Sequence, residues 1–204
     1  CKKYNIVVIE DAAESLGSFT SSIHTGRTGQ IGTLSFNGNK IITTGGGGAL
    51  ITDDRDLARR AKHLTTTAKQ PHPWLFLHDQ VGYNYRLPNI NAALGCAQME
   101  QLPTFVNKKR KLAHQYRNWF AERDQEFVSE PSGAASNYWL NSIVLANIDE
   151  RDEFLTFTNS RNVMTRAMWT PMHTLPMYRG CYRTDLSNTE AIEKRLVNIP
   201  SSVV

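Results

Sequence analysis

Two acidic side chains stand directly after an apolar segment near the start of the chain. Residues 6–10 begin with the run Ile-Val-Val-Ile, which predicts a buried parallel strand, and Asp11 and Glu14 follow in the next turn. In open α/β sheets ligands bind at the carboxyl ends of the strands, so these two carboxylates could point at one site. Asp11 could equally be the N-cap of a helix, and the pair alone leaves both interpretations open.

A lysine follows the next predicted strand. Residues 33–36 are expected to form a short strand, and Asn37-Gly38-Asn39-Lys40 comes directly after it. A lysine amine in a pocket can form a Schiff base with an aldehyde cofactor. The alternative is an exposed loop lysine, as most lysines are.

Together, Asp11 and Lys40 predict a site for pyridoxal 5'-phosphate (PLP). That cofactor requires a lysine for covalent attachment and a carboxylate beside its pyridine nitrogen. The carboxylate keeps the nitrogen protonated, because a nearby opposite charge favours the charged form. The hydroxyl of Ser35, helped by backbone N–H groups, could bind the phosphate.

The elements that must position these residues alternate between strand and helix, which predicts an α/β or α+β fold. The glycine run at 45–48 leads into a strand at 49–52, and Asp53 or Asp54 can cap a helix that reaches Leu64. A polar loop at 65–85 follows. Pro88 and Pro103 each suit a helix start, the second helix ending near Arg123. Beyond it we expect a strand at 137–146, a helix at 149–161 and a strand at 163–169.

Several apolar side chains are expected to be buried. Ile90, Ala93, Leu94 and Ala97 share one helix face, and Cys96 is expected to pack beside it. Trp139 and Trp169 are expected in the core of a small domain, with stacking on a sugar or uracil ring as the alternative. We place the large-domain piece at residues 1–118 and the small domain at 119–204.

Composition excludes several classes of protein. With 40% apolar and 21% charged residues the chain is expected to be globular. The basic run at 108–111 has helical spacing and is interpreted as a solvated helix face, so no nucleic acid is expected as a partner. Three widely spaced cysteines predict neither disulfides nor a zinc site, but a reducing, cytoplasmic setting. No segment approaches the roughly 20 apolar residues that span a bilayer, so no membrane association is expected.

At this point the chain resembles a known family, the DegT/DnrJ/EryC1/StrS sugar aminotransferases. The resemblance lies in Asp11-Ala-Ala-Glu-Ser-Leu-Gly17, Ser35-Phe-Asn-Gly-Asn-Lys40, Thr44-Gly-Gly-Gly-Gly-Ala49, Gly82-Tyr-Asn-Tyr-Arg-Leu87 and Asn91-Ala-Ala-Leu-Gly95. It implies PLP-dependent transferase fold type I, with a partial large domain and a small α+β domain. Because two-domain members are roughly twice this length, we expect this chain to be the C-terminal part of a longer protein.

The resemblance also implies roles for single residues around the cofactor. Lys40 would be the Schiff-base lysine, and Asp11 would face the pyridine nitrogen. Glu14 would lie near the ring and its 3-hydroxyl, where many relatives have Gln. Ser35 would bind the phosphate. No metal ion is expected.

Other implied roles concern the partner subunit and the substrate, since the family resembles homodimers with shared active sites. Asn84 would reach a phosphate in the partner's site, with Arg86 as the competing donor. His173, in Pro171-Met-His-Thr-Leu-Pro176, would lie near the active site and contact substrate; a structural histidine is the alternative.

The expected activity is transfer of an amino group from glutamate to a nucleotide-linked keto sugar. The segments 63–74 and 136–141 resemble aminotransferases of legionaminic-acid and bacillosamine pathways, which act on UDP-linked 4-keto-6-deoxy-N-acetylglucosamine. Alternatives are an aminotransferase for another sugar or cyclitol, a related dehydratase, or a truncated, non-catalytic or regulatory member of the fold. Lys40 argues against the dehydratase branch, which has His there. The family's Gly-Ser/Thr phosphate turn and ring-stacking aromatic are absent from these 204 residues, which favours the non-catalytic alternative.

Overall fold

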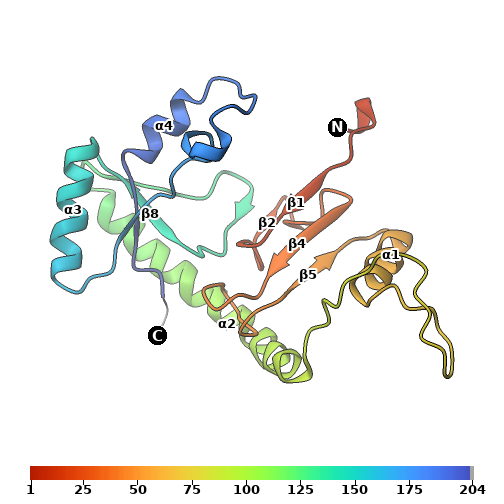
Figure 1. Cartoon of the computed structure of the whole chain (residues 1–204). Coiled ribbons are helices and arrows are strands. Elements are labelled where there is room, and N and C mark those ends of the chain that lie inside the picture. The colour runs from red at the N-terminus through yellow and green to blue at the C-terminus, as the bar shows by residue number, and fades with distance from the viewer. Residues whose placement is uncertain (203–204) are drawn as a thin grey trace. The chain divides into compact units, whose positions relative to one another are not determined.

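The computed structural model describes residues 1–202, and the chain divides into two compact units (Figure 1). Unit 1 comprises Cys1–Asn107 and Pro131–Trp139, and unit 2 comprises Lys108–Glu130 and the chain from Leu140 onward. The first crossing between the units lies inside helix α2 (Asn89–Phe120). The assignment of residues 1–118 to a PLP-binding domain and of 119–204 to a small domain stays a prediction.

Unit 1 contains a three-stranded sheet in the order β1-β4-β5 (Figure 1). Strand β1 (Ile9–Asp11) runs parallel to β4 (Ile31–Ser35), with Asp11 opposite Thr33. The expected parallel pairing is therefore confirmed, but the expected burial is wrong, since Ile9 is 68% exposed. Within residues 1–202, β1 is paired along one edge only, so its apolar side chains lack the neighbours that a buried parallel strand has.

The glycine run leads into strand β5 (Gly48–Ile51), which pairs antiparallel with β4. Gly45 and Gly47 have φ values of 79° and 87°, a backbone conformation that favours glycine. A Cβ atom at Gly48 would lie 2.3 Å from the carbonyl oxygen of Leu34, so this position has no room for a side chain. Backbone geometry thus favours glycine at three of the four positions of the run, Gly45, Gly47 and Gly48.

Helix α1 (Arg55–Thr65) begins where the sequence predicts. The Asp54 carboxylate accepts hydrogen bonds from the N–H groups of Asp56 and Leu57, which satisfies two otherwise unpaired donors of the first turn. Of the two expected caps, Asp53 and Asp54, the structure uses Asp54.

Helix α2 is one continuous helix, so the prediction of two helices starting at Pro88 and Pro103 is wrong. Pro103 lies inside it, where its ring removes one N–H but does not end the helix. The expected burial of its first apolar face is also wrong, because Ile90 is 86% exposed and Ala93, Leu94, Ala97 and Cys96 are exposed as well. The helical spacing of these residues is correct, but no element among residues 1–202 covers them.

The core of unit 1 lies beside the middle of α2. Leu16, Ile41 and Ile42 are buried, and partly buried side chains from β4, from the residue after it and from α2 pack against them; these are Leu34, Phe36, Leu102, Phe105 and Val106. A second small sheet has the order β3-β2-β7 and consists of Ile23–His24, Phe19–Thr20 and Ala134–Ala135. Strand β7 brings the Pro131–Trp139 segment back into unit 1.

Unit 2 is built on an antiparallel sheet in the order β6-β8-β10-β9. Its strands are Glu126–Phe127, Asn141–Val144, Leu196–Ile199 and Arg166–Ala167. Its helices are α3 (Ile148–Ser160) and α4 (Ser187–Glu193), and short 3-10 turns occur at Met172–Thr174 and Pro176–Tyr178. A further 3-10 turn, Lys2–Tyr4, belongs to unit 1. Trp169 is 62% exposed, so its expected place in a core is wrong.

Candidate active site

Asp11 is the last residue of β1, and no helix follows it, so its interpretation as a helix cap is wrong. Its Oδ1 accepts hydrogen bonds from the N–H of Ala13 at 3.1 Å and from the hydroxyl of Thr33 at 3.4 Å. Its Oδ2 receives no hydrogen bond from residues 1–202. The carboxylate is thus held on one side, while its second oxygen is left to accept a hydrogen bond from a ligand.

Lys40 lies in the loop after β4, and its side chain is only 12% exposed. Its ammonium forms an ion pair with the carboxylate of Glu14, from the turn after β1. The interpretation of Lys40 as an exposed loop lysine is therefore wrong. The turn that carries Asp11 and Glu14 and the loop that carries Lys40 meet at the carboxyl ends of two neighbouring parallel strands.

Two further residues at this place were not predicted from the sequence. The indole N–H of Trp139 donates a hydrogen bond of 2.6 Å to the carbonyl of Asn39, and the ring centroid lies 4.7 Å from the Lys40 Nζ. The amide of Asn137, which is 3% exposed, donates hydrogen bonds to the carbonyls of Glu14 at 2.8 Å and Leu16 at 3.0 Å. No role for Asn137 follows from the sequence, and Trp139 is expected in a small-domain core or on a sugar or uracil ring, whereas Trp139 belongs to unit 1 and lies beside Lys40.

The loop after Lys40 is anchored on the first turns of α2. The side-chain oxygen of Gln98 accepts a hydrogen bond from the Thr43 N–H, and the Asn91 amide donates one to the Thr44 carbonyl. Gly95 lies between these two residues on the helix, where a Cβ atom would come within 2.9 Å of the Thr44 methyl group. Positions 91, 95 and 98 share one helix face, which gives a physical reason for Asn91, Gly95 and Gln98 in this sequence.

Ser35 is the last residue of β4, and its hydroxyl oxygen accepts a hydrogen bond from the Asn37 N–H at 3.3 Å. It is half-buried and stands five residues before Lys40. Its location at the carboxyl end of the strand is compatible with a phosphate-binding role, which stays a prediction.

Asn84 and Arg86 belong to the segment that returns from the 65–85 loop. Asn84 forms an isolated β-bridge with Thr66, and Arg86 donates a hydrogen bond to the Thr66 carbonyl at 3.3 Å. In the same loop His63 bonds the Asp79 carboxylate at 2.7 Å, which lowers the pKa of Asp79. Asn84 and Arg86 are both exposed, and no contact joins them to Lys40 within residues 1–202.

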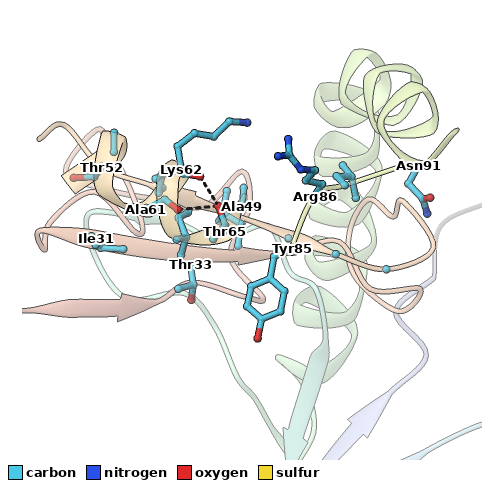
Figure 2. Close-up of a pocket in the computed structure, with 18 of the residues that line it drawn as sticks. Ile31, Thr33, Ala49, Thr52, Ala61, Lys62, Thr65, Tyr85, Arg86 and Asn91 are labelled. Atoms are coloured by element: carbon cyan, nitrogen blue, oxygen red, sulfur yellow. Dashed lines mark hydrogen bonds between the residues drawn. The ribbon is translucent and has the colours of Figure 1, made fainter. Parts of the chain in front are cut away.

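Arg86 lines a pocket of about 1160 Å³ in unit 1. Figure 2 shows Asn91 at one end of the pocket and Thr52 and Ile31 at the other, with Arg86 and the α1 residues Ala61 and Lys62 between them. Thr33 also lines it, and Thr33 bonds Asp11. The lining does not include Lys40, Asp11, Glu14 or Ser35, so this pocket is not the place where the predicted reactive groups gather.

His173 belongs to unit 2, where its Nε2 is 2.9 Å from a carboxylate oxygen of Glu190. Its side chain is 13% exposed. The pair is compatible with the structural alternative for this histidine, and its contact with substrate stays a prediction.

Comparisons with known proteins agree with the fold and with these motifs. The model of the DegT/DnrJ/EryC1/StrS aminotransferase family matches residues 1–203. The chain is 38% identical over 179 residues to EpsN of Bacillus subtilis (strain 168), whose name proposes a pyridoxal phosphate-dependent aminotransferase; the match covers 87% of this chain and 46% of EpsN. It is also 38% identical over 200 residues to the GDP-perosamine synthase of Escherichia coli O157:H7, covering 98% of this chain and 54% of the synthase.

Among solved structures, the aminotransferase TlmJ from Streptoalloteichus hindustanus superposes with a TM-score of 0.92 at 26% identity, over 98% of this chain and 55% of TlmJ. This confirms the predicted α/β aminotransferase fold. The chain spans about half the length of the curated relatives it matches. Because the family model matches almost every residue, the chain belongs to the DegT/DnrJ/EryC1/StrS aminotransferase family.

Proposed function

We propose that this chain carries the lysine-bearing part of a PLP-dependent aminotransferase that transfers an amino group from glutamate to a nucleotide-linked 4-keto-6-deoxy sugar. The observation that carries the proposal is the largely buried Lys40 amine, held against Glu14 beside the turn that begins at Asp11. An amine and a carboxylate at the carboxyl ends of neighbouring parallel strands provide the lysine and the acidic partner that PLP requires. The residues present therefore fit this cofactor.

Each residue has a defined task in the proposal. Lys40 Nζ would be the point of covalent attachment, and its amine, when free, would take a proton from the α-carbon of the amino donor and deliver it to the cofactor. Asp11 would accept a hydrogen bond from the ring nitrogen, and the Ser35 hydroxyl would bind the phosphate. The cofactor, when bound, supplies an electron sink. Glu14 is the counter-ion that holds Lys40 in place.

The residues proposed for the partner's site and for the substrate are Asn84, Arg86 and His173. Asn84 and Arg86 are exposed on the segment before α2, where a second copy of the chain could reach them. We propose a homodimer with shared sites, in which Asn84 or Arg86 binds a phosphate across the interface. His173 is proposed as a substrate contact.

The nucleotide of the substrate is the finer part of the proposal. The resemblance of segments 63–74 and 136–141 favours a UDP-linked N-acetylhexosamine derivative, whereas the name of the E. coli relative favours a GDP-linked sugar. Contacts with the nucleotide decide between the two, because a hydrogen-bonding pocket rejects a mismatched partner strongly.

The test is an amino-transfer assay on the polypeptide as its gene encodes it, with PLP, glutamate and a panel of UDP- and GDP-linked 4-keto-6-deoxy sugars. The expected product is an amino sugar nucleotide, identified by mass, from one nucleotide class in preference to the other. Lys40→Ala is expected to abolish turnover, with Lys111→Ala, an exposed lysine of α2 outside the pocket lining, as the control. Full turnover by the Lys40→Ala variant would refute the proposal.

A further inference from the structure

The Pro131–Trp139 segment belongs to unit 1, although the residues on both sides of it in the chain belong to unit 2. It enters by pairing β7 with β2 and then presents Asn137, Tyr138 and Trp139. Tyr138 is buried and has a φ of 46°, a conformation that non-glycine residues adopt rarely. The backbone is thus turned sharply just before Trp139.

Trp139 contacts the Lys40 loop in two ways. Its indole N–H bonds the Asn39 carbonyl, the peptide group directly before Lys40, and so fixes the main chain there. Its ring lies 4.7 Å from the Lys40 Nζ, within the range of a cation–π interaction. Because the Lys40 side chain is only 12% exposed, solvent weakens this attraction less than it would at the surface.

The same segment also holds the other partner of Lys40. The side-chain amide of Asn137 donates hydrogen bonds to the carbonyls of Glu14 and Leu16, and its side-chain oxygen accepts a hydrogen bond of 2.8 Å from the backbone N–H of Trp139. One buried asparagine therefore links the turn that carries Glu14 to the tryptophan that faces Lys40. The ammonium is held between a carboxylate and an aromatic face, both anchored at residue 137.

We propose that Trp139 is the positioning residue for Lys40, which fixes the amine beside Glu14 before any cofactor binds. The inference rests on the proposed function, in which Lys40 is the reacting amine. It gives Trp139 a role different from burial in a small-domain core and from stacking on a sugar or base. Positioning of this kind reduces the number of orientations the amine can adopt and so favours the productive one.

The test measures the reactivity of Lys40 in the purified chain without PLP. The chain is treated with formaldehyde and cyanoborohydride, and methylation of each lysine is followed by peptide mass mapping, normalised to Lys62. Trp139→Leu removes the ring and the N–H, and is expected to speed methylation of Lys40 about two- to fivefold. Trp139→Phe keeps an aromatic face and should raise the rate less, while the control Trp169→Leu should leave it unchanged.

An unchanged methylation rate of Lys40 in Trp139→Leu would overturn the proposal. An equal rise in rate at every lysine would also overturn it, because it would mean that the substitution loosens the whole fold. If Trp139→Leu does not fold, tryptophan fluorescence provides a second test. The emission of Trp139 is obtained by subtracting the spectrum of Trp139→Phe, and Lys40→Met should change it. Unchanged Trp139 emission in Lys40→Met overturns the proposal. Both measurements are independent of PLP. A failure of PLP to attach to Lys40 would instead refute the proposed function.

Discussion

The ammonium of Lys40 is ion-paired with the carboxylate of Glu14, 26 residues earlier in the chain. The two residues meet because β1 and β4 are parallel neighbours, so the turn after one strand and the loop after the other emerge at the same edge of the sheet. Asp11, three residues before Glu14, ends β1 at that edge. This arrangement supports a site in which an amine and a carboxylate act on one ligand.

Replacing Asn137 by Ala should destabilise unit 1. The variant leaves the carbonyls of Glu14 and Leu16 without their donor in a buried place, which costs about 1–3 kcal/mol. Urea unfolding of Asn137→Ala beside Gln101→Ala, an exposed position of α2, measures the difference. Equal midpoints for the two variants would contradict the assigned role of the Asn137 amide.

Glu10 should make the stability of unit 1 depend on acid. The hydrogen bond from the Gly29 N–H holds the pKa of Glu10 below its ordinary value of 4.5, and the hydrogen bond from the Gly26 N–H adds to this effect. Partial desolvation of the carboxyl acts in the other direction but is weaker than the effect of the Gly29 N–H. The folded carboxyl binds its proton less tightly than the unfolded one, so this stability is fully present above pH 4.5 and is lost as pH falls through the folded pKa.

Glu10→Gln should therefore lower stability at neutral pH by roughly 1 kcal/mol, since solvent screens a half-exposed carboxylate. It should also flatten the loss of stability below pH 4.5. Unfolding midpoints from pH 3 to 7 test this, and a parallel acid loss in variant and wild type would show that another group is responsible.

Lys109 should give unit 2 a pH dependence of the same sign as that of Glu10, but at alkaline pH. Its side chain is buried and donates to the Ser201 carbonyl at 2.8 Å, and burial lowers the pKa of Lys109 below 10.5. Between the lowered value and 10.5 the unfolded chain binds more protons than the folded one, so stability rises with pH across that window.

Lys109→Met should remove this rise, whatever its effect on absolute stability. The measurement is the slope of the unfolding free energy against pH between 8 and 10.5, with the exposed Lys108→Met as control. If the slope survives in Lys109→Met, the alkaline dependence belongs to another residue.

Replacing Pro103 by Ala should stabilise helix α2. The proline lies inside the helix and cannot donate to the carbonyl one turn earlier, whereas alanine restores that donor and has the highest helix propensity. The expected gain is up to about 3 kcal/mol in unfolding free energy, read from thermal unfolding. A lower midpoint in Pro103→Ala would show that the proline ring makes packing contacts worth more than the missing hydrogen bond.

Local signals predicted the helices well where capping and spacing decide them. Asp54 caps α1 as expected, and Asn147 caps α3 (Ile148–Ser160), close to the expected 149–161. The error at Pro103 has a physical origin, because proline suits a first turn and can also be accommodated inside a long helix supported by tertiary contacts. A proline followed by a helical pattern looks the same in the sequence whether the proline starts a helix or lies inside one.

Burial and long-range contacts were predicted less well. The apolar run before Asp11 and the apolar face at Ile90 indicate surfaces that another element can cover, but a pattern does not encode which element does so. Trp139 reaches Asn39 across 100 residues, and no local signal links two positions so far apart. Lys40 and Asp11 could be proposed from the sequence because Asp11 stands at the predicted end of one strand and Lys40 follows the predicted end of another within a few residues.

The most direct test of the account is the site of covalent attachment of PLP. The chain is mixed with PLP, reduced with borohydride and mapped by mass, beside Lys40→Ala and Lys62→Ala. We predict a visible absorbance band and a label on the peptide that contains Lys40, lost in Lys40→Ala and retained in Lys62→Ala. A label distributed over other lysines, with Lys40 unmodified, would contradict the assignment of Lys40 as the reacting amine.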